Sequence, residues 1–371
     1  MLSTASPKLA VRTPDAVPTA ALASPGYAWW YLDLLNDDGD GVVIIASFGL
    51  PFLPGLASSD RAGEPKLAAR RASLNVAVYR GHRRCAYVLQ ELPEHVCAWN
   101  DGHIELGQTS LRSVDTQGQR TLKVELDCPL PGTDTRLTGH IELRGVAPTV
   151  RGHEEGPHGW AVRGVGPSTG HIRAGSRTLL EVEGRGYHDT NWSSLPLHRL
   201  DMDRWLWARI AGPLGDRVLW MLWPEDGGDP VTRYFHVSDQ LIEEDCEVQI
   251  HGSRRGLFGL RAPRRIEVET DRERATIHLD HLVDDGFFYQ RFATSVTLGG
   301  RRVPGTAELV HPHRVDLNRH RALVRMAHHD LTGRNSMWLP LFCGTQHDRL
   351  PRLLRWWWRR ATTRPDLLGV H

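Results

Sequence analysis

The stretch GRGYHDTNW, residues 184–192, places a phenol hydroxyl, an imidazole, a carboxylate and an amide within five consecutive positions. Tyr187 and Asp189 are two residues apart, so their side chains share one face of a β-strand. Such a pair could deliver a proton to a substrate, or the Asp could cap backbone groups in a turn. Because Glu181 and Glu183 precede them on the same face, spacing alone favours a solvated strand that ends in a turn.

Two features would instead bring Asp189 into a buried site. Gly184 and Gly186 lie in the same strand, where glycine often marks a β-bulge that re-aims the side chains that follow it. Upstream, PHGWAV places His158 and Trp160 on one strand face as an i, i+2 pair. Burial beside apolar walls raises the pKa of a carboxyl group, so an Asp in such surroundings could stay neutral and donate a proton.

Two aromatic segments could line a binding site for an extended apolar molecule. GYAWWYLDLL contains Trp29, Trp30 and Tyr31 in a row, which either fill one end of a β-barrel or form a wall that stacks on a ligand. DRWLWARI places Trp205 and Trp207 on one face of a strand. Their rings either pack between sheets or line a cavity and stabilise a cation, at about 0.5–2 kcal/mol per contact.

Other motifs of catalysis or cofactor binding are missing from the sequence. It has no P-loop, no GxSxG and no CxxC, so no nucleotide is expected. The histidines of HPH (His311, His313) and HHD (His328, His329, followed by Asp330) are metal-ligand types. They would have to meet across strands to form a three-ligand site, and 20 His are spread over the chain, so we expect no metal.

The composition excludes several classes of protein. Lys plus Arg total 45 and Asp plus Glu total 44, a balance that argues against a nucleic-acid partner. The five Cys are scattered and odd in number, which predicts free thiols in a reducing cytoplasm. No run of about 18 apolar residues occurs, so no transmembrane helix is expected. Residues 1–21, rich in Ala, Pro, Ser and Thr, are expected to form a disordered leader and no signal peptide.

Most of the 371 residues are typical of antiparallel β-strands. SLNVAVYR and RCAYVLQE alternate around the turn GHR, which predicts a hairpin, and similar runs recur through the second half. The only strong helix candidate is DRLPRLLRWWWRRATT, residues 348–363. We therefore expect an all-β protein with two tandem barrel or sandwich domains, 22–190 and 191–345, followed by a basic aromatic tail, 346–371, with a short helix.

Several blocks, in order along the chain, resemble the carotenoid 1,2-hydratases (hydroxyneurosporene synthases) and their lipocalin-like relatives. GYAWWYLDLLNDDGDGVVIIASFG resembles the opening strand pair of that family, and LNVAVYRGHRRCAYVLQE its next hairpin. PHGWAV matches the His-x-Trp element and GRGYHDTNW the Gly-Tyr-x-Asp-x-Asn-Trp signature. DMDRWLWARI resembles the aromatic strand that follows, and VDDGFFYQRF a later element. The resemblance covers roughly residues 25 to 295.

The resemblance implies two lipocalin-like β-domains and a cofactor-independent reaction that adds water across the terminal 1,2 double bond of an acyclic carotenoid. It implies that Asp189 donates the proton, with Tyr187, His158 and Trp160 as catalytic residues around it. Protonating the alkene creates a tertiary carbocation, so the acid must be neutral, and each unit of raised pKa favours the neutral form by ~1.4 kcal/mol. The expected substrate-binding residues are Trp30, Tyr31, Asn191, Trp205 and Trp207.

The sequence also departs from the family pattern. GLPFLPGL replaces a Ser-Pro-Tyr-type segment, and Ser193 follows the signature where Gly is usual, which puts the shape of the pocket mouth in doubt. Two other functions stay open: a cyclase or pericyclase of terpenoid or polyketide biosynthesis, and a non-catalytic binder of an apolar ligand. The tail RLLRWWWRR either docks through its Trp or lies at the inner face of the membrane, where an apolar polyene or terpenoid substrate resides.

Overall fold

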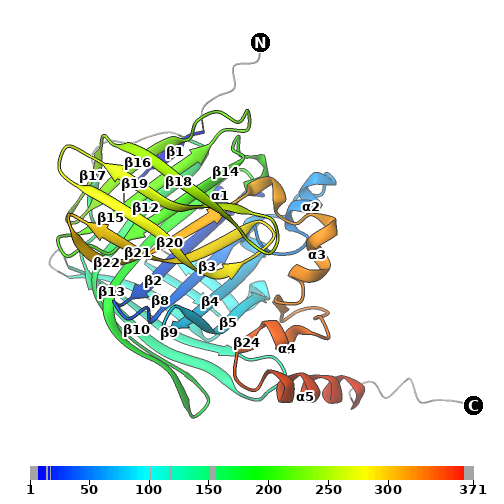
Figure 1. Cartoon of the computed structure of the whole chain (residues 1–371). Coiled ribbons are helices and arrows are strands. Elements are labelled where there is room, and N and C mark those ends of the chain that lie inside the picture. The colour runs from blue at the N-terminus through cyan, green and yellow to red at the C-terminus, as the bar shows by residue number, and fades with distance from the viewer. Residues whose placement is uncertain are drawn as a thin grey trace, which may run out of the picture.

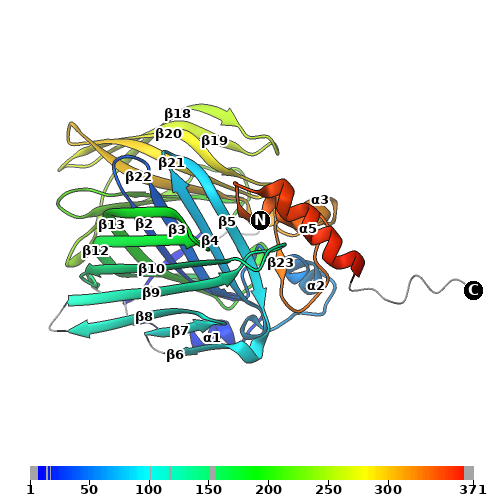
Figure 2. The ribbon, with the colours of Figure 1, turned by 90° about the horizontal axis from the view of Figure 1, so that it is seen from below.

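The structure is a computed structural model that describes residues 7–13, 16, 18–100, 102–116, 119–150 and 156–362. Two large curled β-sheets face each other, and helices α2, α3 and α5 gather along one side of the molecule (Figures 1 and 2). Strands account for 56% of the residues and helices for 14%. The prediction of an all-β fold with a C-terminal helix is therefore confirmed.

The first sheet has 14 strands within the described residues, and two of them pair off its main path. In spatial order the main path is β23 (His329–Asp330), β5 (Arg83–Leu92), β4 (Ala72–Arg80), β3 (Gly41–Phe48), β2 (Tyr27–Leu35), β13 (Arg177–Ser193), β12 (His158–Ala174), β10 (Arg136–Gly145), β9 (Gln119–Pro129), β8 (Thr109–Thr116), β7 (His103–Leu106) and β6 (Cys97–Asn100). The other two are β1 (Leu9–Val11), which pairs with β12, and β24 (Gly344–Thr345), which pairs with β5.

The second sheet has ten strands within the described residues, and only its short edge pair β11–β17 is parallel. Its spatial order is β11 (Thr149–Val150), β17 (Gln240–Glu244), β16 (Val231–Val237), β15 (Asp216–Trp223), β14 (Arg204–Ile210), β22 (Arg301–Val310), β21 (Tyr289–Leu298), β20 (Arg274–Asp285), β19 (Arg261–Glu269) and β18 (Glu247–Arg255).

The helices are short and lie in the connections, except for the one that ends the described chain. The α-helices are α1 (Thr19–Leu22), α2 (Leu56–Arg61), α3 (Asn318–Val324), α4 (Leu339–Phe342) and α5 (Arg349–Thr362). The 3-10 turns are η1 (Ala68–Arg70), η2 (Glu94–Val96), η3 (Leu197–Arg199) and η4 (Pro312–Arg314). Helix α5 matches the helix predicted over 348–363. No described helix has the length and apolar character needed to cross a membrane.

The protein has three apolar cores among its described residues. One core lies inside the curl of the first sheet, one inside the curl of the second, and the third fills the space between the sheets. Strands β2 and β3 contribute to both the first and the third core, so they are buried on both faces. Their sequences, YAWWYLDLL and GVVIIASF, are accordingly apolar at nearly every position. The core between the sheets is the one that positions the candidate site.

The main strands of the two sheets divide near the domain boundary expected at residue 190. The long strand β13 ends at Ser193, and β14 of the second sheet begins at Arg204. Three short strands cross this division, because β11 joins the second sheet while β23 and β24 join the first at β5. The assignment of 22–190 and 191–345 as domains stays a prediction.

Part of the expected disordered leader is placed in the structure. Residues 9–11 form β1, which pairs in parallel with His158 to Trp160 of β12. All three residues of β1 are buried, so apolar side chains hold this segment against the first sheet. For these residues the expectation of disorder is wrong, and residues 1–6, 14–15 and 17 lie outside the described residues.

Candidate active site

The candidate residues lie on three neighbouring strands of the first sheet, β2, β12 and β13, which face the second sheet. On β13, Tyr187, Asp189 and Asn191 occupy alternate positions and therefore share one face. The strand keeps an unbroken register with β2 from Arg185 to Ser193. This regular alternation places three polar side chains in one row toward the core between the sheets.

Cover by the second sheet buries this row. Glu181 and Glu183, on the same face of β13, are exposed, whereas Tyr187 and Asp189 are 0% and 2% exposed. The strand is 17 residues long, so its first half extends past the second sheet and its second half lies beneath it. Charged residues therefore occupy the uncovered first half of β13, and polar residues that become buried occupy the half covered by the second sheet.

The bulge expected in β13 is not where the sequence suggested. Gly184 and Gly186 pair regularly with β12, so they do not re-aim the side chains that follow. The register shift near the acid lies on the partner strand, between Val162 and Gly164 of β12, opposite the stretch that ends at Asp189. A second shift leaves Leu179 as an extra residue on β13, before the glycines. The expectation is wrong because the glycines sit in a continuous ladder between these two shifts.

Three neutral donors surround the carboxyl group of Asp189. The hydroxyl of Tyr187 donates to Oδ2 at 2.8 Å, and the indole Nε1 of Trp160 donates to the same oxygen at 2.9 Å. The amide Nδ2 of Asn191 donates to Oδ1 at 2.8 Å. The structure therefore brings together the acid, the Tyr, the Trp and the Asn that the sequence singled out.

Burial raises the pKa of Asp189 from its ordinary value of 3.8 to about 7. The hydrogen bonds from Tyr187 and Trp160 oppose this shift, and the negative charges of Glu308 and Asp33 add to it. No cation is among these causes. Near neutral pH the group is thus close to half protonated and can act as a proton donor.

A chain of hydrogen bonds connects Asp189 to residues on the two adjacent strands. The Nδ2 of Asn191 is used on Asp189, so its Oδ1 must accept from Nε2–H of His158 at 3.2 Å. The Nδ1 of His158 then accepts from the hydroxyl of Tyr27 at 2.7 Å. Burial lowers the pKa of His158 to about 4, so its ring is neutral and orients Asn191.

A cavity of about 40 Å³, called here the reaction cavity, lies against Asp189. Aromatic and aliphatic side chains supply most of its wall. It is lined by Trp29, Tyr31, Ile45, Leu50, Phe52, Asp189, Asn191, Trp205, Trp207, Trp220, Glu308 and Val310. The indole nitrogens of Trp207 and Trp220 are buried and have no hydrogen-bond partner among the described residues.

A larger cavity of about 290 Å³, called here the entry cavity, adjoins the reaction cavity. The two share Ile45, Leu50 and Phe52 as lining residues. Phenylalanines and residues of helix α3 form much of the remaining wall, together with the ion pair between Asp284 and Arg291. An extended apolar molecule can therefore occupy the entry cavity with one end directed at Asp189.

The structure corrects the choice of Trp30 as a substrate-binding residue. Trp30 faces the core inside the first sheet, where its ring lies 6.2 Å from Phe48 and 6.5 Å from Trp99. Trp29 and Tyr31 alternate with it on β2 and line the reaction cavity. The two adjacent tryptophans must point in opposite directions on a strand, and the sequence does not show which face meets the ligand.

Trp160, which the resemblance implies as a catalytic residue around Asp189, does not present its ring to the reaction cavity. It is fully buried and does not line the reaction cavity, and its ring packs against Trp220 and Phe235 at 5.9 and 5.0 Å. Its contribution to the site is the indole N–H that binds Asp189. Trp205 and Trp207, by contrast, line the cavity as the period-two spacing predicts.

Two networks of buried charge flank the acid. Arg209 of β14 is fully buried and pairs with both Asp33 of β2 and Asp216 of β15. Arg291 of β21 binds Glu308 of β22 at 2.9 Å. The first network ties the two sheets together beside Tyr187, whose ring centre lies 5.4 Å from the Arg209 guanidinium carbon.

Sequence reasoning missed Tyr27, Trp220 and Glu308 as site residues, and it did not distinguish Trp29 from Trp30 in the aromatic row. Tyr27 and Trp29 could have been assigned to the site, because they share the period-two row of β2 with Tyr31. Glu308 is the charged residue of an otherwise apolar run, TAELV, which is a weaker signal. Across the described ranges, no three His, Cys, Asp or Glu side chains are grouped to hold a metal ion.

The fold and the site define a class: a lipocalin-like β-protein that encloses a carboxylic acid of raised pKa in an aromatic cavity. The family model for carotenoid hydratase CrtC matches residues 44–331, and the chain belongs to this family. It is accordingly an enzyme of the hydro-lyase type.

The chain is also similar in sequence to two named proteins. The chain is 28% identical over 292 residues to acyclic carotenoid 1,2-hydratase of Thiocapsa roseopersicina, covering 77% of this chain and 67% of that protein. It is 21% identical over 323 residues to hydroxyneurosporene dehydrogenase of Chlorobaculum tepidum, covering 78% of this chain and 84% of that protein.

Two solved structures share the fold. An AttH protein of Nitrosomonas europaea matches with a TM-score of 0.55 and 15% identity, over 78% of this chain and 93% of that chain. CghA in complex with Sch210972 matches with a TM-score of 0.50 and 14% identity, over 81% of this chain and 95% of that chain. At these identities the likeness concerns the fold alone.

Proposed function

We propose that this enzyme adds water across the terminal 1,2 double bond of an acyclic carotenoid of the lycopene or neurosporene type, without a cofactor. The observation that carries the proposal is Asp189, a buried acid with a pKa of about 7 that lines an aromatic cavity. Membership of the carotenoid hydratase family and the name of the Thiocapsa relative support the reaction.

We assign the acidic proton to Oδ1 of Asp189. Oδ2 accepts two hydrogen bonds, from Tyr187 and Trp160, whereas Oδ1 accepts one, from Asn191. Transfer of this proton to C2 of the alkene forms a C–H bond and leaves a tertiary carbocation at C1. A positioned general acid of matched pKa accelerates such a step by about 10²–10⁴-fold.

The aromatic wall stabilises the carbocation. Trp29, Tyr31, Trp205, Trp207 and Trp220 line the reaction cavity. A cation over such a ring face gains about 0.5–2 kcal/mol per contact. His158 is neutral because its pKa is lowered to about 4, so it adds no positive charge beside the cation.

The entry cavity fits one end of a long polyene. Its volume of about 290 Å³ is at the lower limit of small-molecule sites, which measure ~300–1,000 Å³. A carotenoid therefore places its terminal isoprenoid unit at Asp189, while the rest of the chain extends toward the cavity mouth. The binding free energy comes from apolar burial, at about 25 cal/mol per Å².

Helices α3 and α4, which contribute Leu323 and Phe342 to the wall of the entry cavity, lie on the side of the molecule that carries α5 (Figures 1 and 2). Leu323 and Phe342 are 47% and 46% exposed, and Leu354 and Trp358 of α5 are 62% and 69% exposed. The same helix also exposes Arg355, Arg359 and Arg360. Apolar and cationic groups on one face suit an anionic bilayer, from which the polyene enters.

Vesicle binding tests this membrane contact. The double variant Leu354→Glu, Trp358→Glu should lose most of its co-sedimentation with phosphatidylglycerol vesicles, because it removes apolar contacts and adds negative charge. Leu214→Glu is the matched control, since Leu214 is 83% exposed in the β14–β15 turn. Equal vesicle binding by the double variant and the wild type would contradict the proposed contact.

Product analysis tests the reaction itself. The protein is expressed in cells that accumulate lycopene or neurosporene, and the extracted carotenoids are examined by mass spectrometry. We expect a product heavier by one water, and we expect Asp189→Asn to reduce its formation by about 10²–10⁴-fold because the proton donor is lost. Asp271→Asn, in the exposed turn between β19 and β20, serves as the control.

Other outcomes separate the proposal from its alternatives. An isomer of unchanged mass but new ring structure would favour a cyclase. Substrate that co-purifies unchanged with both the wild type and Asp189→Asn would favour a binding protein. Hydration at the wild-type rate by Asp189→Asn would show that another group supplies the proton.

A further inference from the structure

Glu308 is a second carboxylate in the reaction cavity, and the proton transfer described above does not use it. It lies on β22, where its cross-strand neighbours are Trp207 of β14 and Arg291 of β21. Glu308 and Asp189 both line the cavity of about 40 Å³. A cavity needs about 10–15 Å³ to hold one water, so a water has room beside Glu308.

Arg291 fixes one oxygen of Glu308 and leaves the other available. Its Nε donates to Oε1 of Glu308 at 2.9 Å, and its Nη1 donates to the hydroxyl of Tyr79 at 2.8 Å. Arg291 is only 2% exposed, so this geometry is tightly held. No described protein group donates a hydrogen bond to Oε2, which can therefore accept one from water.

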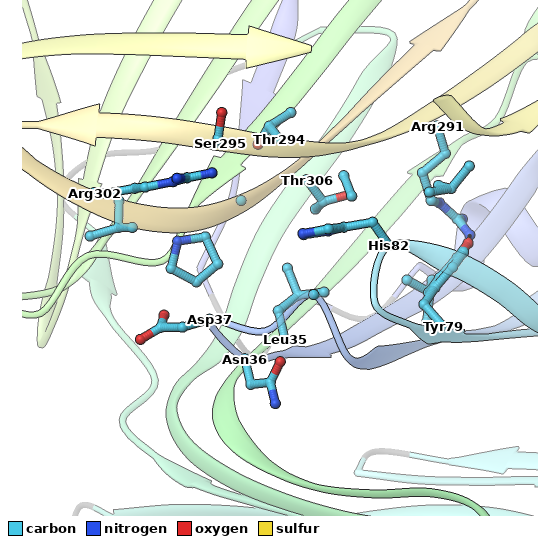
Figure 3. A pocket seen from close by; sticks show the side chains of 17 residues that line it. Leu35, Asn36, Asp37, Tyr79, His82, Arg291, Thr294, Ser295, Arg302 and Thr306 are labelled. Atoms are coloured by element: carbon cyan, nitrogen blue, oxygen red, sulfur yellow. Dashed lines mark hydrogen bonds between the residues drawn. The ribbon is translucent and has the colours of Figure 1, made fainter. Parts of the chain in front are cut away.

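A third cavity, of about 190 Å³, has Arg291 in its wall, together with apolar and polar side chains (Figure 3). Arg291, Tyr79, Thr294 and Thr306 line it, and Figure 3 shows Arg291 beside Tyr79 at one end. Thr306 precedes Glu308 by two residues on β22, so the two share a face. The buried hydroxyl of Thr294 has no hydrogen-bond partner among the described residues, which suits a cavity that holds water.

We infer that Glu308 is the general base of the hydration, which orients the attacking water and takes its proton. The inference rests on the proposed function. In the step, the water oxygen forms a bond to C1 of the carbocation, and one O–H bond of that water breaks as Oε2 of Glu308 accepts the proton. Asp189 is then a carboxylate and Glu308 an acid, and proton transfer through water restores both.

A base at this position decides the fate of the carbocation. Without it, water attacks slowly, and the cation returns a proton from C2 to the Asp189 carboxylate, which regenerates the alkene. In D₂O the acidic group of Asp189 carries a deuteron, so a reversal that removes the original proton of C2 leaves deuterium at C2 of the recovered substrate. Deuterium in the recovered alkene therefore reports protonation separately from capture by water.

The experiment compares Glu308→Gln with the wild type in D₂O, with lycopene in detergent as substrate. We expect hydration by Glu308→Gln to fall by about 10²–10⁴-fold, which is the usual contribution of a general base. We also expect it to keep incorporating deuterium into unreacted lycopene at a rate within tenfold of wild-type protonation. Glu308→Asp, which keeps the carboxylate, should recover part of the hydration.

Matched variants distinguish a base from a structural residue. Glu91→Gln breaks a similarly buried pair, Arg71–Glu91, whose side chains are both 12% exposed, away from all three cavities. It should leave both hydration and exchange unchanged once thermal melting shows that it is folded. Asp189→Asn should abolish exchange and hydration together, because it removes the proton donor.

Two results would overturn the inference. Hydration by Glu308→Gln at the wild-type rate would show that Glu308 is not the general base. Loss of both hydration and exchange in a folded Glu308→Gln variant would also contradict the inference, because Glu308 would then be needed for protonation by Asp189. A wild-type enzyme that neither hydrates nor exchanges would overturn the proposed function as well. If both the wild type and Glu308→Gln hydrate the substrate at the same rate, the role of Glu308 is wrong and the proposed function stands.

Discussion

Asp189 and Asp284 are both buried carboxyl groups at the interface of the two sheets, and their chemistry is opposite. Asp189 is 2% exposed and accepts hydrogen bonds only from neutral donors on Tyr187, Trp160 and Asn191. Burial raises its pKa to about 7. Asp284 is 7% exposed, accepts a hydrogen bond from Tyr79 and forms ion pairs with Arg84 and Arg291.

The difference between the two carboxyls lies in the charge of their partners. Burial alone would raise the pKa of Asp284, but the positive charges of Arg84 and Arg291 outweigh it and lower the pKa below the ordinary value of 3.8. The same desolvation thus yields an ion pair at one position and a proton donor at the other. The enzyme keeps cations away from Asp189 and places aromatic rings there instead.

We expect the largest effect, a loss of unfolding free energy, when the carboxylate of Asp284 is removed. Asp284→Asn leaves Arg84 and Arg291 without their shared carboxylate, and breaking a buried ion pair costs about 3–5 kcal/mol of unfolding free energy. Urea denaturation at pH 7 measures this loss. Because the pKa of Asp284 is lowered in the folded state, the loss is complete at neutral pH and disappears as the pH falls through the folded-state pKa.

A half-exposed ion pair provides the control for that prediction. Asp127 pairs with Arg136, and their side chains are 32% and 38% exposed. Asp127→Asn should cost at most about 1 kcal/mol, because solvent screens the pair. If Asp284→Asn were no more destabilising than Asp127→Asn, the view of Asp284 as a structural ion pair would have to be abandoned.

A smaller effect should appear in the pH dependence of the reaction. Only protonated Asp189 can donate, so kcat/KM should fall tenfold per pH unit above pH 7. The groups that face Asp189 are Tyr187 and Asp33 of the first sheet, and Glu308 of the second. The pKa of His158 is lowered to about 4, so it titrates below the range measured.

The variant Glu308→Gln sharpens the pH prediction. The negative charge of Glu308 contributes to the raised pKa of Asp189, so its removal should move the fall in rate to lower pH. Residual hydration and deuterium exchange should show the same shift. A rate that rises above pH 7 in the wild type would be incompatible with a proton donor at Asp189.

The residues around Asp189 could be predicted from the sequence because they lie a few positions apart on β13 and on β12, the strand that pairs with it. Tyr187, Asp189 and Asn191 share a face of β13 by spacing alone, and the resemblance to a known family added His158 and Trp160 on the neighbouring strand. The all-β class also followed from alternation and turn residues. These features depend on residues a few positions apart or on paired strands.

The features that failed depend on which face meets the other sheet. Trp30 and Trp29 are adjacent, and only the arrangement of the two sheets decides that Trp29 lines the reaction cavity. Glu308 and Arg291 come from strands of the second sheet, more than one hundred residues from Asp189. Their approach to the acid is a tertiary property that alternation within a strand does not encode.

The central claim is that Asp189 is a neutral acid near physiological pH, and infrared difference spectroscopy tests it most directly. The carbonyl band of a protonated carboxyl group is followed from pH 5 to pH 9 in the wild type, and Asp189→Asn identifies the band that belongs to Asp189. We expect that band to disappear with a midpoint near pH 7. A band already absent at pH 5 would show that Asp189 is ionised like an ordinary Asp, and it would contradict the account.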